Sequence, residues 1–132
     1  MGGQTMEGRV EYAAMRKREM NCCQAVLVAF ADVLGRSEAE LLRMGSGFGS
    51  GMGTMEGTCG ALVGAIMVSS LVSEKGEAMS NSRTIVPRFK DLCGGATICR
   101  ELKGVDTGRP LCSCEDCVRN AVRAAEEALG VS

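Results

Sequence analysis

Residues 57–64 read Gly-Thr-Cys-Gly-Ala-Leu-Val-Gly and join a glycine-rich stretch to the longest apolar segment of the chain. Thr58 belongs to the residue types that cap helix N-termini, so this stretch predicts a helix that begins at Cys59. A thiol in the first turn of a helix lies beside unpaired backbone N–H groups and the positive end of the helix dipole, which favour the thiolate. Gly60 and Gly64 share one helical face, against which another backbone can pack closely.

The composition favours one helical domain. The chain has 132 residues, of which 45% are hydrophobic and only 3% aromatic, and it contains no tryptophan. This length suits a single domain, residues 1–132, that buries its own core. Because aromatic rings are scarce, Met, Ala, Val and Leu must fill that core, and most of these residue types favour helices. We expect residues 1–5 to be disordered.

Helix-capping signals recur along the chain, and no run of alternating β-branched residues interrupts them. Capping-box patterns occur at residues 21–24, 37–40 and 113–116. Thr97 can cap another short helix, and Pro87 is tolerated only near the first turn of its helix. These signals predict an all-α fold, a compact bundle of about six helices. The expected long segments are 6–20, 22–34, 59–72, 82–93 and 114–129, and the short ones are 37–44 and 98–102.

Glycine recurs at alternate positions between residues 45 and 53, which a stable surface helix does not tolerate. We therefore expect a Gly-rich loop before the central apolar helix. The dinucleotide-binding pattern G-x-G-x-x-G fails in every register, and no Gly-Lys-Ser/Thr follows. The glycines instead indicate a backbone that passes close to another segment, to a cofactor or to the neighbouring thiols, and of these close packing is favoured.

Charge and residue types exclude several functions. The formal net charge is −1, so we expect neither nucleic acid nor an anionic membrane surface as a partner. The chain has no histidine, which excludes Ser-His-Asp triads, Cys-His nucleophile pairs and histidine-ligated metal sites. The remaining chemistry is that of sulfur and carboxylates.

The cysteine content bears on the compartment. The chain has eight cysteines and begins with a polar, helix-like segment that does not resemble a signal peptide. We therefore expect a cytoplasmic protein, in which cysteines more often serve catalysis, redox sensing or metal binding than structural disulfides. The apolar run 59–72 is too short to span a bilayer, so no membrane insertion is expected.

Four predicted helices begin at a cysteine or one residue before it: those at Cys22, Cys59, Cys99 and Cys114, the last of which also carries Cys117 in its first turn. If these N-termini converge, their thiols form one cluster of activated sulfurs. One use of such a cluster is thiol–disulfide exchange or electron transfer, which would make the protein a thiol–disulfide oxidoreductase.

Two alternatives stay open. A soft metal site built from Cys22, Cys59, Cys99, Cys114 and Cys117 would hold zinc or an iron–sulfur cluster, although only residues 112–117 have a compact ligand spacing. The other alternative is a non-enzymatic helical protein whose cysteines are passive core residues.

The motifs also carry a family resemblance. Four segments resemble the redox-active family named C_GCAxxG_C_C. They are Asn21 to Val26 (Asn-Cys-Cys-Gln-Ala-Val), Cys59 to Gly64 (Cys-Gly-Ala-Leu-Val-Gly), Cys99 to Leu102 (Cys-Arg-Glu-Leu) and a cysteine before Val118. The resemblance covers nearly the whole chain and includes the C-G-A-x-x-G motif without a mismatch. It implies a redox role and a functional link to a transporter.

Carried over by motif, the family cysteines are Cys22, Cys59, Cys99 and either Cys114 or Cys117, with Cys114 preferred. Four further cysteines are not part of the family pattern and would serve as resolving thiols or be passive residues. They are Cys23, Cys93, Cys112 and whichever of Cys114 and Cys117 is not the family cysteine. By its cap and its flanking glycines, Cys59 ranks first as the reactive thiol, with Cys22 as its partner and Cys99 and Cys114 as a second pair. A redox protein or a small thiol is the expected partner, and the apolar surplus would allow a homodimer.

Overall fold

The computed structural model describes residues 6–131, and within them every regular element is a helix. This confirms the all-α expectation. Six of the α-helices in this part of the chain have eight or more residues, and α3 and α7 are single turns. The predicted disorder of residues 1–5 lies outside the described residues. The elements are α1 (Met6–Arg16), α2 (Cys22–Ala29), α3 (Ala31–Leu34), α4 (Glu38–Gly45), the π-helical turn η2 (Gly51–Met55), α5 (Gly60–Val72), α6 (Glu77–Leu92), α7 (Cys99–Leu102) and α8 (Cys114–Leu129).

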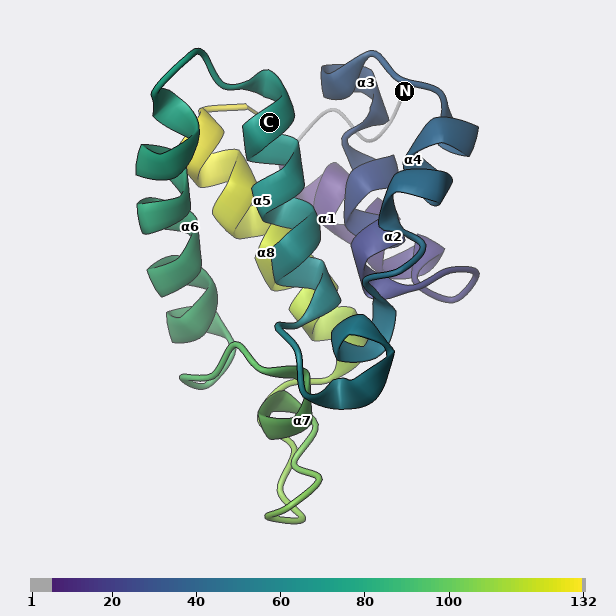
Figure 1. Ribbon diagram of the computed structural model, residues 1–132, viewed down its shortest axis with the longest axis vertical. Coiled ribbons are helices and arrows are strands. Elements are labelled where there is room, and N and C mark those ends of the chain that lie inside the picture. The colour runs from purple at the N-terminus through teal and green to yellow at the C-terminus, as the bar shows by residue number, and fades with distance from the viewer. Residues whose placement is uncertain (1–5, 132) are drawn as a thin grey trace.

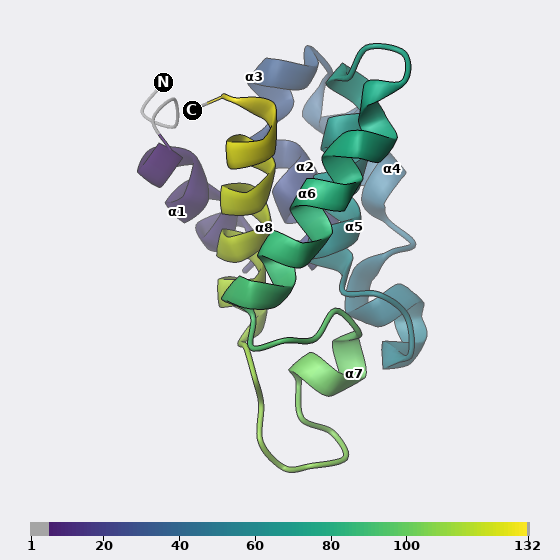
Figure 2. The ribbon, with the colours of Figure 1, turned by 90° about the vertical axis from the view of Figure 1, so that its left-hand side faces the viewer.

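Helix α5 is the centre of the bundle. Figure 1 shows it between α6 on one side and α2 with α4 on the other, and α8 runs behind it. Helix α5 packs against α2, α6 and α8, and α8 in turn packs against α1. Figure 2 shows α7 and the loop after it at one end of the bundle, beyond α6 and α8. Among the described helices, none is long and apolar enough to cross a bilayer.

Glycines allow α5 to approach its neighbours closely, as the sequence predicted. A Cβ atom at Gly64 would lie 3.0 Å from the carbonyl oxygen of Cys23 in α2. A Cβ atom at Gly60 would lie 2.6 Å from the carbonyl oxygen of Phe48, in the segment after α4. Both neighbours are backbone atoms, which cannot move aside as a flexible side chain can. The N-terminal half of α5 therefore fits its place only without side chains at these positions.

A buried ion pair joins the first helix to the last. Arg9 in α1 is only 2% exposed, and its Nε lies 2.7 Å from Glu126 Oε2 in α8. Its Nη1 atom lies 2.7 Å from Asp32 Oδ1, and its guanidinium lies over the Phe30 ring, 4.7 Å from the centroid. The charged hydrogen bonds and the ring compensate part of the cost of burying this cation.

Several helix bounds differ from those expected. Helix α1 ends at Arg16, and the segment predicted as 22–34 is divided at Phe30, whose φ of −104° and ψ of 15° break the helix. Helix α6 begins at Glu77, so Pro87 lies in its interior and the expectation that Pro87 marks a first turn was wrong. Only Ile85 and Phe89 of α6 are buried, so most of this helix faces solvent, where a carbonyl without its usual N–H partner can bond to water.

Gly60→Ala tests the close packing of α5. We expect this substitution to lower the free energy of unfolding by about 1 to 3 kcal/mol, because its Cβ must displace backbone. Gly47→Ala is the matched control, since Gly47 is exposed and a Cβ there meets no atom within 4 Å. Urea denaturation of the two variants and the wild type measures the difference. Equal stability of the two variants would contradict the packing argument.

Candidate functional site

Cysteines from four segments surround one cavity of about 50 Å³ at the α7 end of the bundle. The cavity is lined by Cys22 at the start of α2, Cys59 before α5, Cys99 at the start of α7, and Cys114 and Cys117 in the first turn of α8. The predicted convergence of these helix starts is therefore observed. A cavity of this size holds a small ion or a few water molecules.

Side-chain caps position two of these thiols: the expected capping box forms at Asn21, whereas at Ser113 only the bond from the Asp116 backbone forms. Asn21 Oδ1 accepts from Gln24 N at 2.8 Å, and Gln24 Oε1 accepts from Asn21 N at 3.0 Å, so α2 begins at Cys22. Ser113 Oγ accepts from Asp116 N at 3.1 Å and starts α8 at Cys114. These local bonds fix where each helix begins and thus the direction of both cysteines.

The predicted caps at Thr58 and Thr97 were wrong. No side-chain cap begins α5 or α7, and the two segments before these helices pair with each other as a short antiparallel bridge. Cys59 N donates to Thr97 O at 2.7 Å, and Cys99 N donates to Gly57 O at 3.0 Å. The bridge joins Cys59 and Cys99 across about 40 residues of sequence, and it makes Cys59 the N-cap residue instead of the first helical residue.

Cys59 acquires thiolate character at this position. Hydrogen bonding from the Cys117 thiol lowers the pKa of Cys59 to about 7, against the effect of burial. The backbone N–H groups of Ala61 and Leu62 and the charge of Lys103 lower the pKa of Cys59 further. The thiolate is thus favoured by its position at the start of α5, although its side chain makes no cap hydrogen bond.

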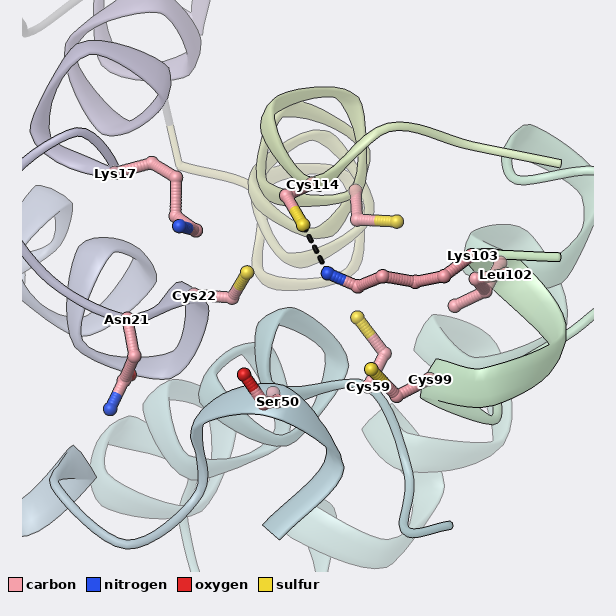
Figure 3. Close-up of a pocket in the computed structure, with 11 residues that line it drawn as sticks. Lys17, Asn21, Cys22, Ser50, Cys59, Cys99, Leu102, Lys103 and Cys114 are labelled. Carbon is pink, nitrogen blue, oxygen red and sulfur yellow. Dashed lines mark hydrogen bonds between the residues drawn. The ribbon is translucent and has the colours of Figure 1, made fainter. Parts of the chain in front are cut away.

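Cys114 is the more exposed of the two cavity thiolates. Hydrogen bonding from the Cys22 thiol lowers the pKa of Cys114 to about 5, and Lys103 and Lys17 act in the same direction. Lys103 Nζ donates to Cys114 Sγ, and Figure 3 shows this contact and the Cys22 thiol pointing into the same space. The same pairing raises the pKa of Cys22, which stays protonated.

Cys99 differs from the other cavity cysteines. Burial raises the pKa of Cys99, so its thiol is not activated, although it stands at the start of a helix. Helix α7 has only four residues, which gives it a short array of aligned dipoles. A Cβ atom at Gly51 would lie 2.7 Å from Cys99 Cβ, so the Gly-rich loop packs directly on this cysteine.

A second sulfur group adjoins the cavity and was not predicted. The Sγ atoms of Cys93, Cys112 and Cys117 all lie within 4.8 Å of one another. The interactions with Cys117 and Cys93 lower the pKa of Cys112 to about 4, and the pKa of Cys117 is raised. The compact spacing of residues 112–117 was a usable signal, but nothing in the sequence indicated that Cys93 joins them. Cys23 lies outside both groups, fully buried with its sulfur 3.7 Å from Met67 Sδ.

Two lysines at the cavity also escaped sequence analysis. Lys17 follows α1, and Lys103 follows α7. Neither lysine lies in a recognisable motif. Each reaches the cavity only because the bundle places the end of its helix there. Interaction with Cys114 raises the pKa of Lys103 despite burial, so this lysine stays charged.

Lys103→Met tests the electrostatic role of this lysine. Because the ammonium stabilises the Cys114 thiolate, we expect the pKa of Cys114 to rise by about 1 to 3 pH units. The alkylation rate of Cys114, followed by mass spectrometry from pH 4 to 9, measures this pKa. The exposed Lys90 provides the control variant Lys90→Met. An unchanged alkylation profile in Lys103→Met would show that Lys103 does not act on this thiol.

One comparison with known proteins identifies a family. The family model described as "Putative redox-active protein (C_GCAxxG_C_C)" matches residues 20–128, a range that includes all eight cysteines. No curated protein and no solved structure matches the chain. The match covers most of the chain and extends over both sulfur groups, and the chain therefore belongs to the C_GCAxxG_C_C family of redox-active proteins.

Proposed function

We propose that this protein is a thiol–disulfide oxidoreductase in which Cys114 and Cys22 form the exchanging pair. The observation that carries this proposal is the position of the Cys114 sulfur, partly exposed at the cavity and in contact with both the Lys103 ammonium and the Cys22 thiol. A low-pKa thiolate that substrate can reach, next to a protonated thiol, is the arrangement that disulfide exchange requires.

The proposed reaction has two steps. The Cys114 thiolate attacks one sulfur of a disulfide substrate, and the other substrate sulfur leaves as a thiolate. Cys22 then loses its proton to solvent and attacks the Cys114 sulfur, which forms a Cys22–Cys114 disulfide and releases the second substrate thiolate. The substrate gains two electrons, the protein loses two, and a small thiol or a reduced redox protein restores the dithiol.

Exposure is the reason to prefer Cys114 over Cys59 as the first thiol. From the sequence, Cys59 ranked first and Cys22 was its partner. Cys59 is only 5% exposed, whereas Cys114 is partly exposed, and the Cys22 thiol interacts with Cys114 by a hydrogen bond. In the proposed reaction Cys59 is a second thiolate at the cavity wall, and Cys99 is the buried thiol beside it.

Disulfide mapping tests the proposed pair. After anaerobic reduction and treatment with one equivalent of a disulfide oxidant, we expect peptide mass spectrometry to find Cys22 joined to Cys114. Cys114→Ser should remove the cavity thiol that reacts below pH 6, and peptide mapping separates its signal from that of Cys112, whose pKa is also low. Cys23→Ser should retain both signals, because burial raises the pKa of Cys23 to about 12. A Cys22–Cys59 disulfide would instead support the ranking made from the sequence.

Metal binding at the cavity is a second candidate function, because Cys22, Cys59, Cys99, Cys114 and Cys117 all line the same space. Thiolates from separate segments can hold zinc or an iron–sulfur cluster. Protein purified without oxygen discriminates between the two functions. Thiol exchange predicts a colourless protein with titratable thiols at Cys22 and Cys114. Visible absorption together with bound iron and sulfide, both lost in Cys22→Ser, would favour the cluster.

A further inference from the structure

We propose that Cys93, Cys112 and Cys117 form a zinc site distinct from the exchanging pair. Their sulfur atoms, all within 4.8 Å of one another, need only a small contraction to surround one ion. Zn–S bonds of about 2.3 Å place the sulfurs of a tetrahedral site about 3.8 Å apart. The three cysteines come from the end of α6, the segment before α8 and the first turn of α8.

Asn120 supports this group from the next turn of α8. Its Nδ2 lies 3.4 Å from Cys93 Sγ and 3.7 Å from Cys112 Sγ, and it also donates to Leu92 O at 3.2 Å. Arg123 Nη1 donates to Asn120 Oδ1 at 3.0 Å, which polarises the amide toward the sulfurs. Asn120 is only 7% exposed. A buried amide that donates to two of the sulfurs is the kind of outer partner that orients metal ligands.

The charge of the three thiolates and their exposure to solvent indicate which ion the site would bind. Three thiolates leave a net charge of −1 with a divalent cation and −2 with a monovalent one, and the smaller residual charge costs less to bury. Soft sulfur ligands and a divalent charge favour zinc. Cys93 and Cys117 are buried, whereas Cys112 is partly exposed, so the fourth coordination position faces solvent on the Cys112 side and takes water.

Zinc at this site would add a second connection between three segments that packing and a few hydrogen bonds already hold together. The loop between α7 and α8 is anchored at its end by Leu111 N and Cys112 N, which both donate to Leu102 O. Coordination would fix Cys112 to α6 and α8 as well. Because the thiols must lose their protons, zinc binding would release protons and stabilise the folded protein.

Zinc titration of the reduced, metal-free protein against a chromophoric chelator is the first test. We expect one zinc ion to bind tightly, and Asn120→Leu to weaken binding about 10- to 100-fold, as loss of an outer partner does. Cys93→Ser and Cys112→Ser should weaken it more, whereas Cys23→Ser should leave it unchanged. Circular dichroism checks that each variant is folded. Absence of tight zinc binding to the folded wild-type protein would overturn the proposal.

Alkylation of the wild-type protein locates the ion without any substitution. Cys112 and Cys114 are the two partly exposed thiols, so with one equivalent of zinc Cys112 should be protected from a maleimide reagent, while Cys114 stays reactive. Mass spectrometry of the peptides reads the pattern. Protection of Cys114 in place of Cys112 would put the zinc in the cavity and would contradict the proposed site.

Discussion

The close contact of α5 with the backbone around it is the constraint on which the rest of the structure depends. A Cβ atom at Gly60 would lie 2.6 Å from Phe48 O and 3.3 Å from Cys23 N, so the segment after α4 and the start of α2 both touch bare helix backbone. This contact brings the N-termini of α2 and α5 together. It also sets Cys59 beside the cavity that Cys22 lines. Larger side chains would separate the helices and move the thiols apart.

The electrostatics of the site follow from this close packing. Thiolates that are excluded from water need compensation, and here it comes from protonated thiols, backbone N–H groups and lysines. Cys114 receives hydrogen bonds from Cys22 and Lys103, and Cys59 receives one from Cys117 and lies beside the first turn of α5. Each low-pKa cysteine is therefore adjacent to a cysteine of raised pKa. That alternation suits a dithiol that forms and breaks disulfides.

Cys117 connects the two sulfur groups. It lines the cavity with Cys22 and Cys114, and it also lies within 4.8 Å of Cys93 and Cys112. The pKa of the neighbouring Cys59 thus depends on what the Cys117 sulfur binds, because the hydrogen bond from the Cys117 thiol is the main cause of the lowered pKa of Cys59. A chain with more cysteines than its family pattern requires can hold two chemically different sulfur groups next to each other.

The sequence by itself determined the local features of this protein. The capping boxes at Asn21 and Ser37 and the Ser113 cap fixed three helix starts, because each depends on neighbours within a few positions. The all-α class and the shared face of Gly60 and Gly64 followed from the pattern of residues. The caps expected at Thr58 and Thr97 were wrong, and α5 and α7 begin one residue later than predicted, since a bridge between distant segments replaced the expected caps.

Only the tertiary structure decided which sulfurs meet. Cys22 faces Cys114 instead of Cys59, Cys93 joins Cys112 and Cys117, and Lys103 reaches Cys114. No local rule links these positions, because their separation along the chain carries no information about their distance in space. The pKa values of the cysteines depend on the same long-range contacts. The proposed exchanging pair and the second sulfur group therefore both depend on the packing of the bundle.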